Sequence, residues 1–193
     1  MAEDRWLVVG LANPESEYGG TRHNVGADAL RVLAARLGVS LTTNKRVRCA
    51  TAETTDREER LVLAVPLSYM NESGGPVQAL TSWFKAPPTQ LIVLHDEIDL
   101  PNGVMRVKFG GGTAGHNGLR DVGRRLGTRD FFRVRIGVGR PPGRQDAADH
   151  VLRRFSAAER EIIDVAVEEA ADAVLGLAHD GLEPTQNRIH PRS

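Results

Sequence analysis

Short apolar runs alternate with longer amphipathic stretches along this chain. The runs that predict strands lie at residues 5–10, 46–54, 60–66, 90–95, 104–108 and 132–138. Residues 91–94, Leu-Ile-Val-Leu, have no polar interruption, which is typical of a central strand. Residues 46–54 and 60–66 flank a charged turn and predict a hairpin, and the alternating residues 104–108 predict a shorter strand nearer an edge.

Helical periodicity fills most of the intervening stretches. The predicted helices cover residues 25–37, a segment ending near residue 84, a basic segment at 119–126, a short one within 146–155 and a long one from 156 to about 179. Strands that alternate with helices predict an α/β fold, a single-domain three-layer sandwich spanning residues 1–193, with a twisted mixed β-sheet flanked by helices. The hairpin argues against a purely parallel sheet.

Polar side chains gather where the predicted strands end. Residues 10–24 follow the first strand and contain Asn13, Tyr18, Arg22, His23 and Asn24. Three further polar positions occupy comparable places: Asn71 after residues 60–66, Asp96 after residues 90–95, and Asn117 beside the glycine-rich segment 109–118. Because strand ends at one edge of a sheet can converge on one cleft, we expect a shared site there.

The residue types in this predicted cleft suit hydrolysis by an activated water. A histidine beside a buried aspartate is an oriented general base, and His23 with Asp96 fits that role. Asparagine amides can position a water and stabilise a developing oxyanion without carrying charge. A nucleophilic serine is the obvious rival, but Ser16, Ser68 and Ser73 all lie outside a Gly-x-Ser-x-Gly motif.

Two other patterns indicate different chemistry. Gly110, Gly112 and Gly115 match the Gly-x-Gly-x-x-Gly dinucleotide fingerprint, but the preceding strand carries basic residues and no acid follows at the expected spacing. His95, Asp96 and His116 offer zinc or manganese ligands without a tight metal-binding spacing, so a metal site stays a secondary alternative. The other histidines, His150, His179 and His190, are expected at the surface.

Charge is distributed unevenly, although the formal net charge of the 193 residues is zero. Residues 104–144 hold ten basic and two acidic side chains, a net charge of +8. Residues 145–183 hold three basic and ten acidic side chains, a net charge of −7. The basic field favours a phosphate-bearing partner. The alternative is that the basic helix neutralises an acidic helix packed beside it.

Composition narrows the setting in which the protein works. No apolar run approaches the roughly 18 residues that span a bilayer, and the N-terminus lacks the features of a secretory signal, so we expect a cytoplasmic protein without membrane contact. The single cysteine, Cys49, excludes an internal disulfide and a multi-cysteine zinc site.

Several ordered motifs together resemble the bacterial peptidyl-tRNA hydrolase family. They are Gly-Leu-Ala-Asn-Pro at 10–14, Tyr18, Thr-Arg-His-Asn at 21–24, Tyr-Met-Asn-Glu-Ser-Gly at 69–74, His-Asp-Glu-Ile-Asp-Leu-Pro at 95–101, Gly-Gly-Gly-Thr-Ala-Gly-His-Asn-Gly at 110–118 and Arg-Val-Arg-Ile-Gly-Val-Gly at 133–139. The resemblance runs from about residue 6 to residue 187.

This resemblance implies an esterase that releases peptide from the 3′ ribose of tRNA, recycling peptidyl-tRNA lost from stalled ribosomes, without cofactor or metal. It implies His23, Asp96 and Asn13 as catalytic residues. The residues implied to bind substrate are Tyr18, Asn24, Met70, Asn71, His116 and Asn117, and those implied to contact tRNA phosphate are Lys108 and Arg135. The implied partner is peptidyl-tRNA, through its acceptor stem and 3′ end, and the implied state is a monomer with no obligate protein partner.

Two alternatives remain open. A non-catalytic RNA-binding relative of the family would bind tRNA without cleaving it. A small-molecule esterase would cleave esters without salt dependence, and would lose nothing on replacement of Lys108 and Arg135 by alanine.

Overall fold

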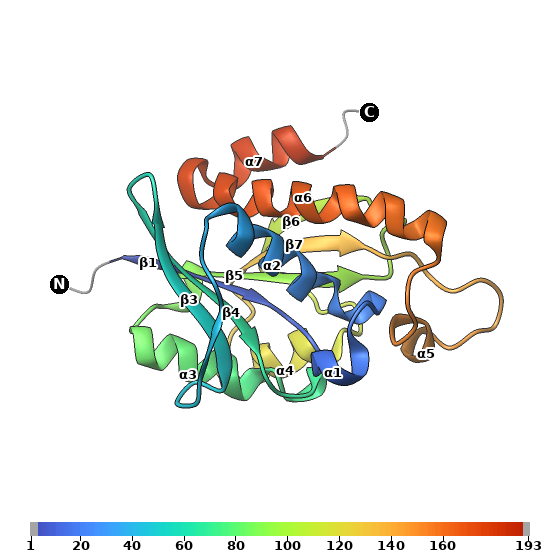
Figure 1. Cartoon of the computed structure of the whole chain (residues 1–193), viewed down its shortest axis with the longest axis horizontal. Helices are drawn as coiled ribbons and strands as arrows, with labels where there is room; N and C mark the ends of the chain where they lie inside the picture. Colours follow the sequence, from blue (N-terminus) through green and yellow to red (C-terminus); the bar gives the residue numbers. More distant parts are fainter. Residues whose placement is uncertain (1–3, 191–193) are drawn as a thin grey trace.

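A mixed sheet of seven strands forms the centre of the computed structural model, which describes residues 4–190 (Figure 1). The strands are β1 (Arg5–Gly10), β2 (Thr42–Asn44), β3 (Cys49–Asp56), β4 (Glu59–Pro66), β5 (Leu91–Glu97), β6 (Met105–Phe109) and β7 (Phe132–Gly137). Their order is β2-β3-β4-β1-β5-β7-β6. Strands β4, β1, β5 and β7 run parallel, whereas β2, β3 and β6 are antiparallel to their neighbours.

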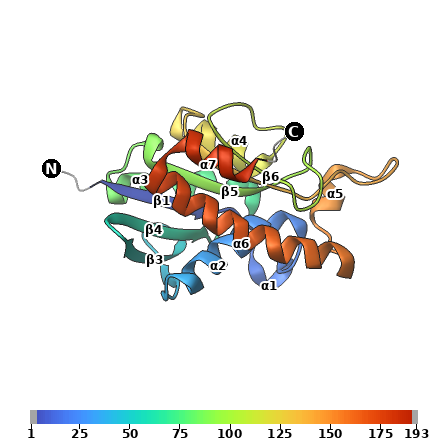
Figure 2. The ribbon, with the colours of Figure 1, turned by 90° about the horizontal axis from the view of Figure 1, so that it is seen from above.

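Helices cover both faces of the sheet. The α-helices are α1 (Glu15–Tyr18), α2 (Val25–Arg36), α3 (Gly74–Phe84), α4 (Asn117–Leu126), α5 (Ala147–Val151), α6 (Ala157–Asp180) and α7 (Leu182–Ile189), with 3-10 turns at Arg22–Asn24, Met70–Glu72 and Pro88–Gln90. Helices α2, α6 and α7 lie on one face, and α3 and α4 lie on the other (Figures 1 and 2). Side chains along β1 alternate between these two faces. Val8 packs in the core under α2 and α6, whereas Leu7 and Val9 pack in the core under α3 and α4. The predicted three-layer α/β sandwich is confirmed.

Most predicted elements are present. All seven residues of β5 are buried between β1 and β7, β3 and β4 form the expected hairpin, and β6 is an edge strand. The strand predicted from residue 46 begins at Cys49 instead, because residues 45–48 form a turn in which Arg48 has a φ of 55°. Helix α7 was not predicted, since Leu182 and Ile189 are its only large apolar residues.

Glycines allow α2 to approach the sheet closely. A Cβ at Gly26 would overlap the carbonyl oxygen of Leu94 in β5, and a Cβ at Gly10 would lie 2.6 Å from the carbonyl oxygen of Gly26. Backbone therefore packs on backbone at this contact. The contact holds the start of α2, and the turn that precedes it, against the ends of β1 and β5.

Within residues 4–190, no helix is both long enough and apolar enough to cross a lipid bilayer.

Candidate active site

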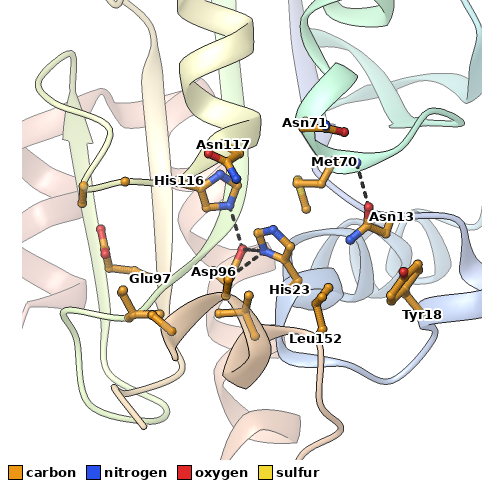
Figure 3. A pocket seen from close by; sticks show the side chains of 16 residues that line it. Asn13, Tyr18, His23, Met70, Asn71, Asp96, Glu97, His116, Asn117 and Leu152 are labelled. Atoms are coloured by element: carbon orange, nitrogen blue, oxygen red, sulfur yellow. Dashed lines mark hydrogen bonds and ion pairs between the residues drawn. The ribbon is translucent and has the colours of Figure 1, made fainter. Parts of the chain in front are cut away.

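A cavity of about 310 Å³ lies where the parallel strands β1, β4 and β5 end (Figure 3). Its walls come from the segments that follow these strands, from the glycine loop (residues 109–118) and from α5. The predicted site residues that line it are Asn13, Tyr18, His23, Met70, Asn71, Asp96, His116 and Asn117. Segments far apart in the sequence thus meet at one edge of the sheet, as expected.

His23 and His116 both contact the buried carboxylate of Asp96 (Figure 3). Nδ1 of His23 lies 2.8 Å from Oδ2 and 3.0 Å from Oδ1 of Asp96. Nε2 of His116 lies 2.8 Å from Oδ1 alone. The carboxylate accepts from two imidazoles, which satisfies it in a site where its side chain is only 2% exposed.

The backbone of α4 determines where His116 carries its proton. His116 is the N-cap residue of α4, and its Nδ1 accepts a hydrogen bond of 3.2 Å from the backbone N–H of Leu119. A neutral imidazole has one donor and one acceptor nitrogen, so Nε2 carries the hydrogen and donates it to Asp96. The carboxylate also accepts from Nδ1 of His23, which leaves the Nε2 lone pair of His23 unprotonated.

The carboxylate of Asp96 and the imidazole of His23 shift each other's pKa values. Burial alone would raise the pKa of Asp96, but the imidazoles of His23 and His116 hold it well below the usual range of a carboxylic acid. Burial lowers the pKa of His23, yet the charge and hydrogen bond of Asp96 outweigh burial and raise this pKa above the ordinary value of 6.5. His23 is therefore a stronger base than a free imidazole.

The same three residues could hold a metal ion. One potential ligand atom from each of His23, Asp96 and His116 lies within 4.8 Å of the other two. A metal would have to replace the N–H hydrogen bonds that join them. His95, the histidine of the predicted metal alternative, instead donates from Nδ1 to the backbone carbonyl of Asp96 at 2.8 Å. Burial, followed by the neighbouring His116, lowers the pKa of His95 to about 3, so it is neutral.

Asn13 and Asn24 form a network beneath the cavity. The Oδ1 atom of Asn24 accepts from the backbone N–H of Asn13 at 2.8 Å, and its Nδ2 donates to the carbonyl of Asn13 at 3.0 Å. Oδ1 of Asn13 accepts from the backbone N–H of Met70 at 2.8 Å, so its NH₂ group is the part left for a ligand. Asn24, predicted to bind substrate, is fully buried and does not line the cavity.

One wall of the cavity was missed by sequence reasoning. Ala147, Ala148, Val151 and Leu152 come from α5 and its C-cap, and all four line the cavity. Figure 3 shows Leu152 close to His23 and Tyr18. Their small and aliphatic side chains gave no chemical signal, and only their helical spacing distinguished them. His150, predicted at the surface, is 7% exposed because its Nε2 donates to the carbonyl of Gly139 inside the fold.

Lys108 and Arg135 lie outside the cavity on the paired strands β6 and β7. Arg135 forms a 3.1 Å ion pair with Glu97, and Glu97 does line the cavity, so the two features adjoin. Partial burial, then Arg135 and Arg133, lower the pKa of Lys108. The positive charge that Arg133 and Arg135 add beside Lys108 is suited to binding a phosphate.

The comparisons with known proteins agree on one family. The family model described as peptidyl-tRNA hydrolase matches residues 7–193. The chain belongs to the peptidyl-tRNA hydrolase family. A curated peptidyl-tRNA hydrolase from Frankia alni is 54% identical over 185 residues, covering 96% of this chain and 93% of the relative. One from Nocardia farcinica is 53% identical over 184 residues, covering 95% of each chain.

A solved structure supports the same assignment. The crystal structure of peptidyl-tRNA hydrolase from Acinetobacter baumannii superposes with a TM-score of 0.92 at 33% sequence identity, covering 98% of this chain and 96% of that one. The sandwich described above is therefore the fold of this peptidyl-tRNA hydrolase, and the resemblance seen in the sequence motifs is confirmed.

Proposed function

We propose that this peptidyl-tRNA hydrolase cleaves the ester between a peptide, or N-blocked amino acid, and the 3′ ribose of tRNA at the cavity, using His23 and Asp96 and no metal. The observation that carries the proposal is the 2.8 Å contact between Nδ1 of His23 and a carboxylate that is itself held by His116. This contact orients the uncharged imidazole of His23 inside a cavity that is also lined by the neutral amides of Asn13, Asn71 and Asn117.

Nε2 of His23 takes a proton from a water molecule while the water oxygen attacks the ester carbonyl. Asp96 stabilises the imidazolium that forms, because its carboxylate already accepts the Nδ1 hydrogen. Collapse of the tetrahedral intermediate breaks the bond to the ribose 3′ oxygen, and His23 returns its proton to that oxygen. The products are the peptide carboxylic acid and tRNA with a free 3′ hydroxyl.

The asparagines supply neutral polar groups around this reaction. The NH₂ group of Asn13 is available to a developing oxyanion, since its Oδ1 is used by Met70. Asn71 and Asn117 also line the cavity and would bind the acylated amide of the substrate. Tyr18 and Met70 would contact the peptide.

Two residues take revised roles. Both ring nitrogens of His116 are engaged, so we assign it to orienting Asp96 instead of binding substrate. Asn24 is assigned to holding the Asn13 backbone. Lys108 and Arg135 would bind a phosphate of the acceptor stem beside the cavity. In this proposal the enzyme works as a cytoplasmic monomer, with peptidyl-tRNA as its partner.

The test is release of N-acetyl amino acid from N-acetyl-aminoacyl-tRNA, with and without EDTA. We expect cleavage that EDTA leaves unchanged, and a loss of about 10²-fold or more in His23→Ala. Binding of tRNA without cleavage would assign the chain to the non-catalytic relatives. Loss of activity with EDTA would make His23, Asp96 and His116 metal ligands. Unchanged activity in Lys108→Ala and Arg135→Ala, without salt dependence, would indicate a small-molecule esterase.

A further inference from the structure

The arginines on the two faces of the sandwich differ in whether they form ion pairs with carboxylates. Every arginine of α2, α6 and α7 has a carboxylate partner, namely Arg31, Arg36, Arg160 and Arg188. On the opposite face, the only such pair within α4 joins Arg124 to Asp121. Within residues 4–190, no ion pair engages Lys45, Arg46, Arg48, Lys85, Arg120 or Arg125.

The positions of the helices exclude the alternative that the basic helix α4 neutralises the acidic helix α6. The basic helix α4 packs with α3 on one face of the sheet, and the acidic helix α6 packs with α2 on the other (Figure 2). The sheet separates them. The positive charge on the α3 and α4 face is therefore available to a partner from outside the chain.

The turn between β2 and β3 extends this charge along α3. The guanidinium of Arg48 lies over the first turn of α3, where a Cβ on Gly75 would come within 2.7 Å of it. The guanidinium of Arg46 lies 5.1 Å from the ring centroid of Trp83 near the end of α3. We call α3 together with Arg46 and Arg48 the α3 surface. Figure 1 shows helix α3 at the lower left of the molecule.

Arg46 and Trp83 are an unusual pair to leave in solvent. Trp83 is 49% exposed, although tryptophan normally buries most of its large apolar surface. Stacking on the indole restricts the planar guanidinium before any ligand arrives, so less conformational freedom is lost on binding. A guanidinium that is oriented, exposed and without a carboxylate is well suited to a phosphate.

We propose that the α3 surface binds the sugar-phosphate backbone of the RNA substrate away from its reacting end. The inference rests on the proposed function for the identity of the RNA. Helix α3 starts beside the cavity residue Asn71 and its 11 residues extend about 16 Å. That length corresponds to roughly five base pairs of a duplex, so Arg46 contacts the body of the RNA and not its acylated end.

The experiment compares Arg46→Ala and Trp83→Ala with Arg188→Ala, an exposed arginine of α7 on the other face. Each variant is assayed on N-acetyl-phenylalanyl-tRNA and on the same acyl ester of the trinucleotide CCA, between 50 and 200 mM salt. We expect the two α3-surface variants to raise KM for the tRNA about 3- to 10-fold with kcat unchanged, and to lower the salt slope by about 1. The trinucleotide ester should be cleaved at the wild-type rate, and Arg188→Ala should match wild type on both substrates.

Two results would overturn the inference: an unchanged KM for tRNA, or equal losses on tRNA and trinucleotide, which would indicate a distorted active site. Affinity for deacylated tRNA, measured by fluorescence anisotropy, separates this inference from the proposed function. If the chain cleaves neither ester, the proposed function fails. The α3 surface is then supported only if Arg46→Ala and Trp83→Ala weaken tRNA binding, and rejected if they do not.

Discussion

Replacing Asp96 by asparagine should move the proton of His23 from Nδ1 to Nε2, so that Nε2 can no longer accept a proton from water. The hydrogen bonds around Asp96 explain this change of tautomer. The N–H of Leu119 makes Nδ1 of His116 an acceptor, so Nε2 of His116 must donate. In Asp96→Asn this donor requires the amide oxygen at the position of Oδ1, 2.8 Å away. The amide NH₂ then occupies the position of Oδ2, 2.8 Å from Nδ1 of His23. That nitrogen has to accept, and the proton moves to Nε2.

The base is then protonated on the nitrogen that should receive a proton. Since general-base catalysis contributes about 10²- to 10⁴-fold, we expect kcat for N-acetyl-aminoacyl-tRNA to fall by a factor in that range. Adding His116→Phe removes the donor that orients the amide, so the amide can turn its oxygen toward His23. The double variant should therefore be faster than Asp96→Asn alone.

Nitrogen-15 NMR of the histidine rings provides the direct test. The expected spectrum of Asp96→Asn shows His23 protonated at Nε2, in contrast to Nδ1 in the wild type. A variant within about threefold of the wild-type rate, or one that keeps the Nδ1 proton, would refute this account.

The other predictions concern pH, stability and the glycine loop. The pKa of His23 is raised above 6.5 and catalysis needs the neutral ring, so kcat/KM should fall as the pH drops through a value above 6.5. In Asp96→Asn the charge that raises the pKa of His23 is lost, so this decrease in kcat/KM should occur at a lower pH than in the wild type. Asn24→Ala should lower the free energy of unfolding by about 1–3 kcal/mol, because it leaves buried backbone groups unpaired, as measured by urea denaturation. Asn71→Ala, at an exposed position, should stay within about 0.5 kcal/mol of wild type. Arg133 is fully buried and donates to two carbonyls of the glycine loop, so Arg133→Met should speed proteolysis there; an unchanged cleavage rate would contradict that role.

Local sequence patterns predicted the layers and the strand ends well, because the buried face of a helix or strand requires apolar residues at regular intervals along the sequence. The unbroken apolar run of β5 appears where expected, and α6 begins at Ala157, one residue from the predicted start, with Ser156 and Glu159 forming a capping box. The pairing of His23 with Asp96 followed from two strands ending at one edge. Family resemblance then narrowed the chemistry to peptidyl-tRNA.

What the sequence did not predict depends on contacts between distant segments. Nothing near His116 indicates that Leu119 would fix its tautomer, or that His116 and His23 would share one carboxylate. Asn24 looks like a ligand-binding amide until its partner, the backbone of Asn13, is visible. The stacking of Arg46 on Trp83 joins residues from a turn and a helix that carry no common motif.

The glycine contact between α2 and β5 has a consequence for how this enzyme tolerates change. His23 lies in the 3-10 turn Arg22–Asn24, which runs directly into α2, and Asp96 lies near the end of β5. Helix α2 and β5 meet at Gly26, backbone against backbone. The separation of His23 and Asp96 is thus set by main-chain atoms, which are the same in every sequence. Substitutions that reshape the core, or the cavity wall formed by α5, can accumulate without altering that separation. A single added methyl group at Gly26 would shift it directly.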